Sequence, residues 1–99
     1  MKFTGKVKEV EREKLMVLGG DEFVGKVNLV GFDRPIPILE ERLHALAEKL
    51  GVPDIIGLEA RVSYRKCLGQ EDLVCFTRFV VDGYGVYPIP PCVTSYRES

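Results

Sequence analysis

The sequence lacks most of the features that catalysis, membrane insertion and duplex DNA binding require. It has a single histidine, and no apolar run approaches the roughly 18–20 residues that a membrane-spanning helix needs. Its 14 basic and 15 acidic side chains leave a net charge of −1, without the basic character typical of DNA-binding proteins. The first residues lead into alternating charge and do not predict a signal peptide. We therefore expect a cytoplasmic protein that does not associate with membranes.

Cysteine is also scarce. The odd number of three cysteines (Cys67, Cys75 and Cys92) without a secretory signal predicts reduced thiols. No spacing among them matches the Cys-x-x-Cys pattern of zinc and redox sites. With a four-residue turn at 68–71, Cys67 and Cys75 are expected on opposite faces of a hairpin. We interpret Cys75 as a small core residue and the other two as incidental thiols.

The remaining composition is that of one globular domain. Hydrophobic residues make up 45% and charged residues 29% of the 99 positions, which are ordinary values for a domain of this size. Asn28 and Gln70 are the only residues of their types, beside abundant Glu, Lys and Arg. That bias is typical of thermophile proteins.

Strand patterns occupy most of residues 1–83. In segment 2–13 the apolar positions change parity between Val7 and Val10, which predicts a long, curved strand with a bulge near Lys8 and Glu9. A polar turn at 11–14 should separate it from a short strand at 15–18. Further strands are predicted at 23–30, 58–65 and 73–81. The last is apolar on both faces, with one set of Leu73, Cys75, Phe79 and Val81 and another of Val74, Phe76 and Val80.

One amphipathic helix is predicted at residues 38–50. Its leucines recur at helical spacing, Pro37 suits the first turn, and Gly51 suits the position after the last turn. Residues 84–99 are rich in proline and cannot form an interior strand. We expect them to be an extended C-terminal segment beside a single β-rich domain of residues 1–83.

The order of these elements is strand, strand, strand, helix, strand, strand. Over residues 2–82 this order resembles the oligonucleotide/oligosaccharide-binding (OB) fold, a five-stranded, partly open Greek-key barrel. The resemblance rests on element order and not on a motif. An open antiparallel sheet with one helix packed on it is the alternative. Both belong to the α+β class and are mainly β.

The sequence offers few groups for chemistry. His44 shares a helix face with Glu40 and Glu48, which suggests either a metal or proton-handling cluster or, as we favour, a solvated surface. The glycines at 19–20 and 83–85 fit turns better than a phosphate-binding loop. We predict no catalytic residues, no metal and no cofactor. A binding or assembly module is therefore favoured over an enzyme, and an enzyme with a composite interface site is the least favoured class.

Two surfaces are candidates for binding. The outer face of the last two strands could bind single-stranded nucleic acid through cations and a stacking ring, with Arg61, Arg65, Phe76 and Arg78 as its residues. A protein interface, including homodimerisation, is predicted through the fifth strand and the C-terminal segment, with Val74, Phe76, Val80, Tyr87 and Pro88 as its residues. The near-zero net charge and acidic isoelectric point (about 5.8) favour protein association.

Both candidate surfaces have structural alternatives. Val74, Phe76 and Val80 could instead be buried in a core. The C-terminal segment could instead pack along its own domain, anchored by Val86 and Ile89.

Overall fold

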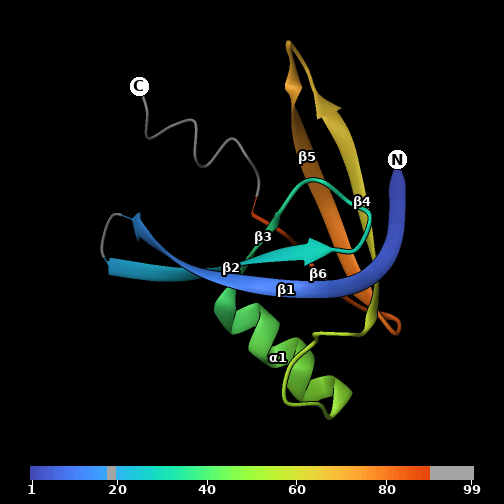
Figure 1. The fold of residues 1–99 in the computed structure, drawn as a ribbon. Helices are drawn as coiled ribbons and strands as arrows, with labels where there is room; N and C mark the ends of the chain where they lie inside the picture. Colours follow the sequence, from blue (N-terminus) through green and yellow to red (C-terminus); the bar gives the residue numbers. More distant parts are fainter. Residues whose placement is uncertain (18–19, 90–99) are drawn as a thin grey trace.

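An antiparallel sheet and one helix make up the computed structural model, which describes residues 1–17 and 20–89 (Figure 1). The elements are β1 (Lys2–Val17), β2 (Gly20–Leu29), β3 (Ile36–Leu39), α1 (Glu40–Leu50), β4 (Glu59–Cys67), β5 (Gln70–Val81) and β6 (Tyr84–Val86). Within these ranges the strand order is β3-β2-β1-β4-β5-β6, and the sheet curls into a half-barrel. The expected α+β, mainly β class is confirmed, and this arrangement is consistent with both an OB-like barrel and an open sheet.

Strand β1 bends because it pairs with two different neighbours. Residues 2–6 pair with β4, whereas the rest of the strand pairs with β2. Val7 lies opposite Leu29 and Glu9 lies opposite Asn28, so Lys8 has no partner of its own in that ladder. This is the β-bulge that the change of parity predicts, and such a bulge increases the local bend and twist of a strand.

The expected turn at 11–14 is absent. Strand β1 continues to Val17, in regular register with β2. The cross-strand ion pair from Lys26 Nζ to Glu13 Oε2 spans 2.6 Å and lies within this paired region. Polar residues here belong to an exposed two-stranded ribbon and not to a turn. The tip of the ribbon, residues 18 and 19, lies outside the described residues.

The helix begins at Glu40 and not at residue 38. Ile36 and Ile38, both fully buried, alternate with Pro37 and Leu39 in a short strand beside β2. Strand alternation buries both isoleucines against the core, so the chain turns into a helix only after Leu39. Gly51 ends the helix in the left-handed conformation (φ 72°), as expected of a glycine C-cap.

A second bulge reverses the side-chain pattern of β5. Ser63 pairs with Arg78 and Tyr64 pairs with Phe76, which leaves Thr77 unpaired in this ladder. The Thr77 hydroxyl donates to the Ser63 carbonyl oxygen at 3.2 Å. The bulge places Val74 and Phe76, before it, on the same concave face as Phe79 and Val81, after it. The expected regular alternation is therefore wrong, and the strand is apolar mainly on one face.

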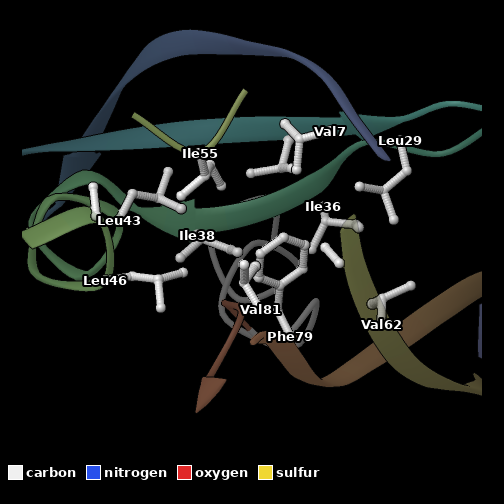
Figure 2. Close-up of a cluster of buried hydrophobic side chains, with 13 residues drawn as sticks. Val7, Leu29, Ile36, Ile38, Leu43, Leu46, Ile55, Val62, Phe79 and Val81 are labelled. Atoms are coloured by element: carbon white, nitrogen blue, oxygen red, sulfur yellow. The ribbon is translucent and has the colours of Figure 1, made fainter. Parts of the chain in front are cut away.

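The core lies between the concave face of the sheet and α1 (Figure 2). Val27, Ile36, Ile38, Val62 and Phe79 have no exposed surface. Burying a side chain of this size contributes about 1.5–3 kcal/mol. The core therefore buries one face of β2 and β3 against the helix. The opposite face of these two strands lies outside this core.

Residues 84–89 belong to the folded domain. Strand β6 pairs with the end of β5, with Val86 opposite Phe79. Beyond it, Arg42 Nη1 donates to the Tyr87 carbonyl at 2.8 Å, and the Ile89 amide donates to the Pro37 carbonyl at 2.8 Å. The expected boundary at residue 83 thus differs from the structure, which continues to Ile89. The rest of the expected extended segment, residues 90–99, lies outside the described residues.

Gly25 provides a test of the contact between sheet and helix. A Cβ atom at this position would clash with Leu43 of α1 and would lie 3.0 Å from Val10 Cγ1. We expect Gly25→Ala to lower the free energy of unfolding by about 1–3 kcal/mol through overpacking. Urea denaturation followed by circular dichroism measures this. The double variant Gly25→Ala/Leu43→Ala should show non-additive recovery, whereas an unchanged midpoint for Gly25→Ala alone would show that the contact is loose.

Candidate functional site

The histidine face of α1 lies at the surface of the described part of the chain. His44 is 75% exposed, and its Nε2 lies 3.8 Å from Glu40 Oε1. The other carboxylate oxygen of Glu40 accepts a hydrogen bond from Arg12 Nε at 2.7 Å. No group of three or more His, Cys, Asp or Glu side chains is placed to hold an ion among residues 1–17 and 20–89.

A cleft of about 450 Å³ lies between two parts of the curled sheet. One wall comes from the β1–β2 ribbon, β3 and the loop before it, and the other comes from β5 and from Ile89, which follows β6. In Figure 1, α1 lies on one side of the β1–β2–β3 layer, and the β4–β5 hairpin rises on the other side. The lining residues are Glu13, Leu15, Val24, Lys26, Arg34, Pro35, Pro37, Leu73, Val74, Phe76 and Ile89.

The first wall is the face of β2 and β3 that points away from the helix. Val24, Lys26 and Pro37 alternate with the core residues of the same strands, so they lie on the opposite face. The ammonium group of Lys26 is paired with the Glu13 carboxylate. This pairing leaves Arg34 as the charge on the first wall without a carboxylate partner among the described residues, and the rest of its surface is mostly apolar.

The second wall depends on the Thr77 bulge. Val74 and Phe76 face the cleft because the bulge sets their parity. Phe76 is partly buried, and its ring centroid lies 6.2 Å from that of Phe32 and 6.4 Å from that of Tyr64. Leu73 remains 40% exposed. In this wall, the ring of Phe76 therefore lies near two other aromatic rings, and the side chain of Leu73 is exposed.

The β3 edge of the cleft is blocked for strand pairing. The Pro37 carbonyl accepts the Ile89 amide, so the backbone of Pro37 faces away from β2. Every second residue of an antiparallel strand faces the same neighbour, which makes residues 35 and 37 the outward-facing ones. Both are proline and have no N–H group to donate. A strand added here could not complete a ladder.

The β5 edge is open by contrast. Within the described residues, β6 pairs only with Phe79 to Val81 on the side away from β4, and no strand pairs with residues 72–76 on that side. The carbonyl of Asp72 points outward and accepts a hydrogen bond from Arg34 Nη1 at 3.0 Å. By alternation, the backbone groups of Val74 and Phe76 point the same way. An extended segment in the cleft would find unpaired backbone groups beside an apolar surface.

The structure separates the residues expected to bind nucleic acid. Arg61 and Arg65 alternate with the core residue Val62, which places both on the convex face, and Arg78 joins them there opposite Ser63. Phe76 lies on the concave face instead. The aromatic side chain expected to stack on bases is therefore on the other side of the sheet from the three arginines.

The residues expected at a protein interface are also divided. Val74 and Phe76 meet in the cleft, whereas Val80 pairs with Arg61 on the convex face. Tyr87 is 67% exposed, and Pro88 is buried against its own domain.

Sequence reasoning missed the other lining residues, above all Pro35 and Pro37. Prolines at every second position indicate a strand edge that cannot donate backbone hydrogen bonds to another strand.

The β4–β5 hairpin contains a disulfide between Cys67 and Cys75, whose Cα atoms are 5.8 Å apart. The expectation of reduced thiols is therefore wrong for this pair. The two residues were assigned to opposite faces on the assumption of an unbroken register. An irregularity between Lys66 and Cys67 breaks that register and allows the sulfurs to meet. Cys92 lies outside the described residues.

Comparison with family models, curated proteins and solved structures finds no match for this chain. Within residues 1–17 and 20–89, the single helix has 11 residues and is too short and too polar to cross a membrane. The argument for function therefore rests on the cleft.

The disulfide gives a prediction for the hairpin that forms one wall. It closes a short loop, with a sequence separation of 8, and loops of this length give about 2–3 kcal/mol of stabilisation. We expect a reducing agent to lower the free energy of unfolding by about that amount, measured by urea denaturation. The variant Cys67→Ser/Cys75→Ser should be insensitive to the reducing agent. A thiol assay of the unreduced, unfolded chain should find one free thiol, and finding three would show that the bond does not form.

Proposed function

We propose that this protein is a non-catalytic association module, and that its cleft binds an extended segment of a protein partner, a second copy of the chain included. The observation that carries the proposal is the apolar cleft beside the unpaired edge of β5. Proteins often recognise extended peptides by adding them to an open sheet edge, where main-chain hydrogen bonds supply affinity and side-chain pockets supply specificity.

The two walls have complementary roles in this proposal. The edge of β5 at Val74 and Phe76 would pair with the backbone of the incoming segment. The opposite wall cannot pair because of its prolines, so it would contact side chains only. An incoming strand would then add to one edge of the sheet and not to both.

The chemistry of the cleft favours a mostly apolar segment. Lys26 and Glu13 neutralise each other at 2.6 Å, whereas Arg34 keeps its positive charge, because its partner is the neutral backbone carbonyl of Asp72. Apolar side chains of the segment would cover Leu73, Val74 and Phe76.

Single-stranded nucleic acid is the competing possibility, and the structure weakens its basis. The convex face that holds Arg61 and Arg78 also contributes Glu59 and Asp82 to a shallow depression. Arg78 itself lies against β6, because a Cβ at Gly85 would be 2.6 Å from Arg78 Nε. Stacking on bases would require an aromatic ring on this face, and Phe76 is on the other.

Leu73 and Leu68 form a matched pair for the test. Leu73 lines the cleft and is 40% exposed, whereas Leu68 lies at the hairpin turn, is 98% exposed and does not line the cleft. We expect sedimentation at increasing concentration to show self-association that Leu73→Lys weakens at least about tenfold, since burying a leucine contributes about 1.5–3 kcal/mol. Leu68→Lys should behave as the wild type, and moderate salt should have little effect.

If the chain is monomeric, two further experiments distinguish peptide binding in the cleft from nucleic-acid binding on the convex face. A synthetic octapeptide of alternating valine and threonine should shift the amide NMR signals of residues 72–76 if the edge of β5 accepts a strand. A chain that neither associates nor binds this peptide would overturn the proposal. Binding of an oligothymidine that is lost in Arg61→Ala and weakens steeply with salt would favour the convex face instead.

A further inference from the structure

Arg34 indicates which part of a partner chain fits the cleft. We propose that the cleft binds the free C-terminus of a partner protein, antiparallel to β5, with the terminal carboxylate on the guanidinium group of Arg34. This inference rests on the proposed function of the cleft. It specifies which end of the partner enters and in which direction it runs.

Two hydrogen bonds connect the walls of the cleft. In one, Arg34 Nη1 from the loop before β3 donates to the Asp72 carbonyl at 3.0 Å. In the other, the Ile89 amide donates to the Pro37 carbonyl at 2.8 Å, after the chain has left the β5 ladder at the end of β6. The unpaired edge of β5 therefore runs from the contact at Asp72 to the end of β6.

The unpaired edge is short, and its length favours a chain end. Strand β6 pairs with β5 only as far as Phe79, so six residues, 73–78, lie between Phe79 and the bonded carbonyl of Asp72. One of these is the bulged Thr77, which leaves room for a segment of about five residues. A segment from the middle of a partner chain would have to cross the contact between Arg34 and Asp72. A segment that ends at Arg34 leaves the cleft at one end only.

Arg34 carries an unbalanced charge at this end of the edge. It is partly buried, and its hydrogen-bond partner is a neutral carbonyl. The other charged residues that line the cleft in the described part of the chain, Lys26 and Glu13, pair with each other. A guanidinium group has five N–H donors, so the bond to Asp72 leaves donors for a carboxylate. Arginine and a carboxylate can form two parallel hydrogen bonds, which are stronger than neutral ones.

The charge of Arg34 also selects the direction of the incoming strand. Strand β6 is antiparallel to β5 and runs toward the end of the edge at Asp72. A strand that adds antiparallel to β5 runs the same way, so its C-terminus arrives at Arg34. A parallel strand would instead bring its N-terminal ammonium group to the guanidinium group, and like charges placed together disfavour such a partner.

The terminal charge of a peptide can be removed without changing the rest of it. The valine–threonine octapeptide, acetylated at its N-terminus, is prepared with a C-terminal carboxylate and with a C-terminal amide. NMR titration of the amide signals of residues 72–76 in the full chain measures both affinities. We expect the carboxylate form to bind about tenfold more tightly, since hydrogen bonds to charged groups contribute more than neutral ones. Equal affinities would overturn the inference and leave the cleft as a peptide-binding site.

Two arginine variants test whether the effect arises in the cleft. Arg34→Gln removes the charge but keeps an N–H donor for the Asp72 carbonyl, and it should bind both forms with the weaker affinity. The control Arg61→Gln changes an arginine of the convex face and should keep the tenfold difference. A difference that persists in Arg34→Gln would overturn the inference. The comparison of the two peptides on the wild-type chain does not depend on the folding of either variant.

A third peptide distinguishes a chain end from an acidic side chain. It is the amidated octapeptide with glutamate as its last residue, which carries a carboxylate but no free C-terminus. We expect it to bind more weakly than the form with the C-terminal carboxylate, because its carboxylate lies farther from the end of the paired backbone. Equal binding would assign the charge to a side chain and overturn the inference as stated.

A nitroxide attached to the N-terminus of the octapeptide, in place of the acetyl group, reports the direction of binding. In the antiparallel arrangement it should broaden the amide NMR signals of residues 84–86 more than that of Arg34. The opposite pattern would show a parallel strand and overturn the inference. If neither the carboxylate nor the amide form binds the wild-type chain, the proposed function itself is overturned, and the inference falls with it.

Discussion

The bend of β1 at Lys8 is the constraint on which the rest of the structure depends. Because the strand pairs with β4 before the bend and with β2 after it, the two parts of the sheet meet at an angle and not in one plane. Two hollows arise from this geometry. Helix α1 fills one with Leu43 and Leu46, and this packing is the core. The other hollow remains open among the described residues and is the cleft.

The cleft shows how a sheet can keep one edge available while blocking the other. Exposed edges invite uncontrolled association, and natural proteins usually protect them. Here Pro35 and Pro37 remove the donors from one side, and Ile89 covers a carbonyl of the same side. Of the two edges beside the cleft, the β5 edge near Val74 keeps unpaired backbone groups within the described residues. Association through the cleft would therefore use one edge of the sheet, in contrast to the open-ended pairing of two bare edges.

Sequence patterns predicted the parts of this structure that depend on local periodicity. The bulge near Lys8 followed from a change of parity, and the end of the helix followed from Gly51. The Thr77 bulge produces the same kind of change, but apolar residues at Val74, Phe76, Phe79 and Val81 were interpreted as two faces of one regular strand. Nothing local distinguishes those two possibilities, because the Ser63 carbonyl that Thr77 contacts comes from another strand. The cleft and the disulfide were missed for the same reason, since both depend on register between strands.

The Thr77 bulge has a consequence for how this surface could change during evolution. Deleting Thr77 would leave Ser63 opposite Arg78 and Tyr64 opposite Phe76, so Val74 and Phe76 would keep their places on the concave face. Pairing Thr77 with Tyr64, in place of skipping it, would instead shift the outer half of the hairpin by one residue. Val74 and Phe76 would then join Arg61 and Arg65 on the convex face, which would combine an aromatic ring with cations. The hairpin carries two alternative surfaces in one sequence, and the register of β5 against β4 selects between them.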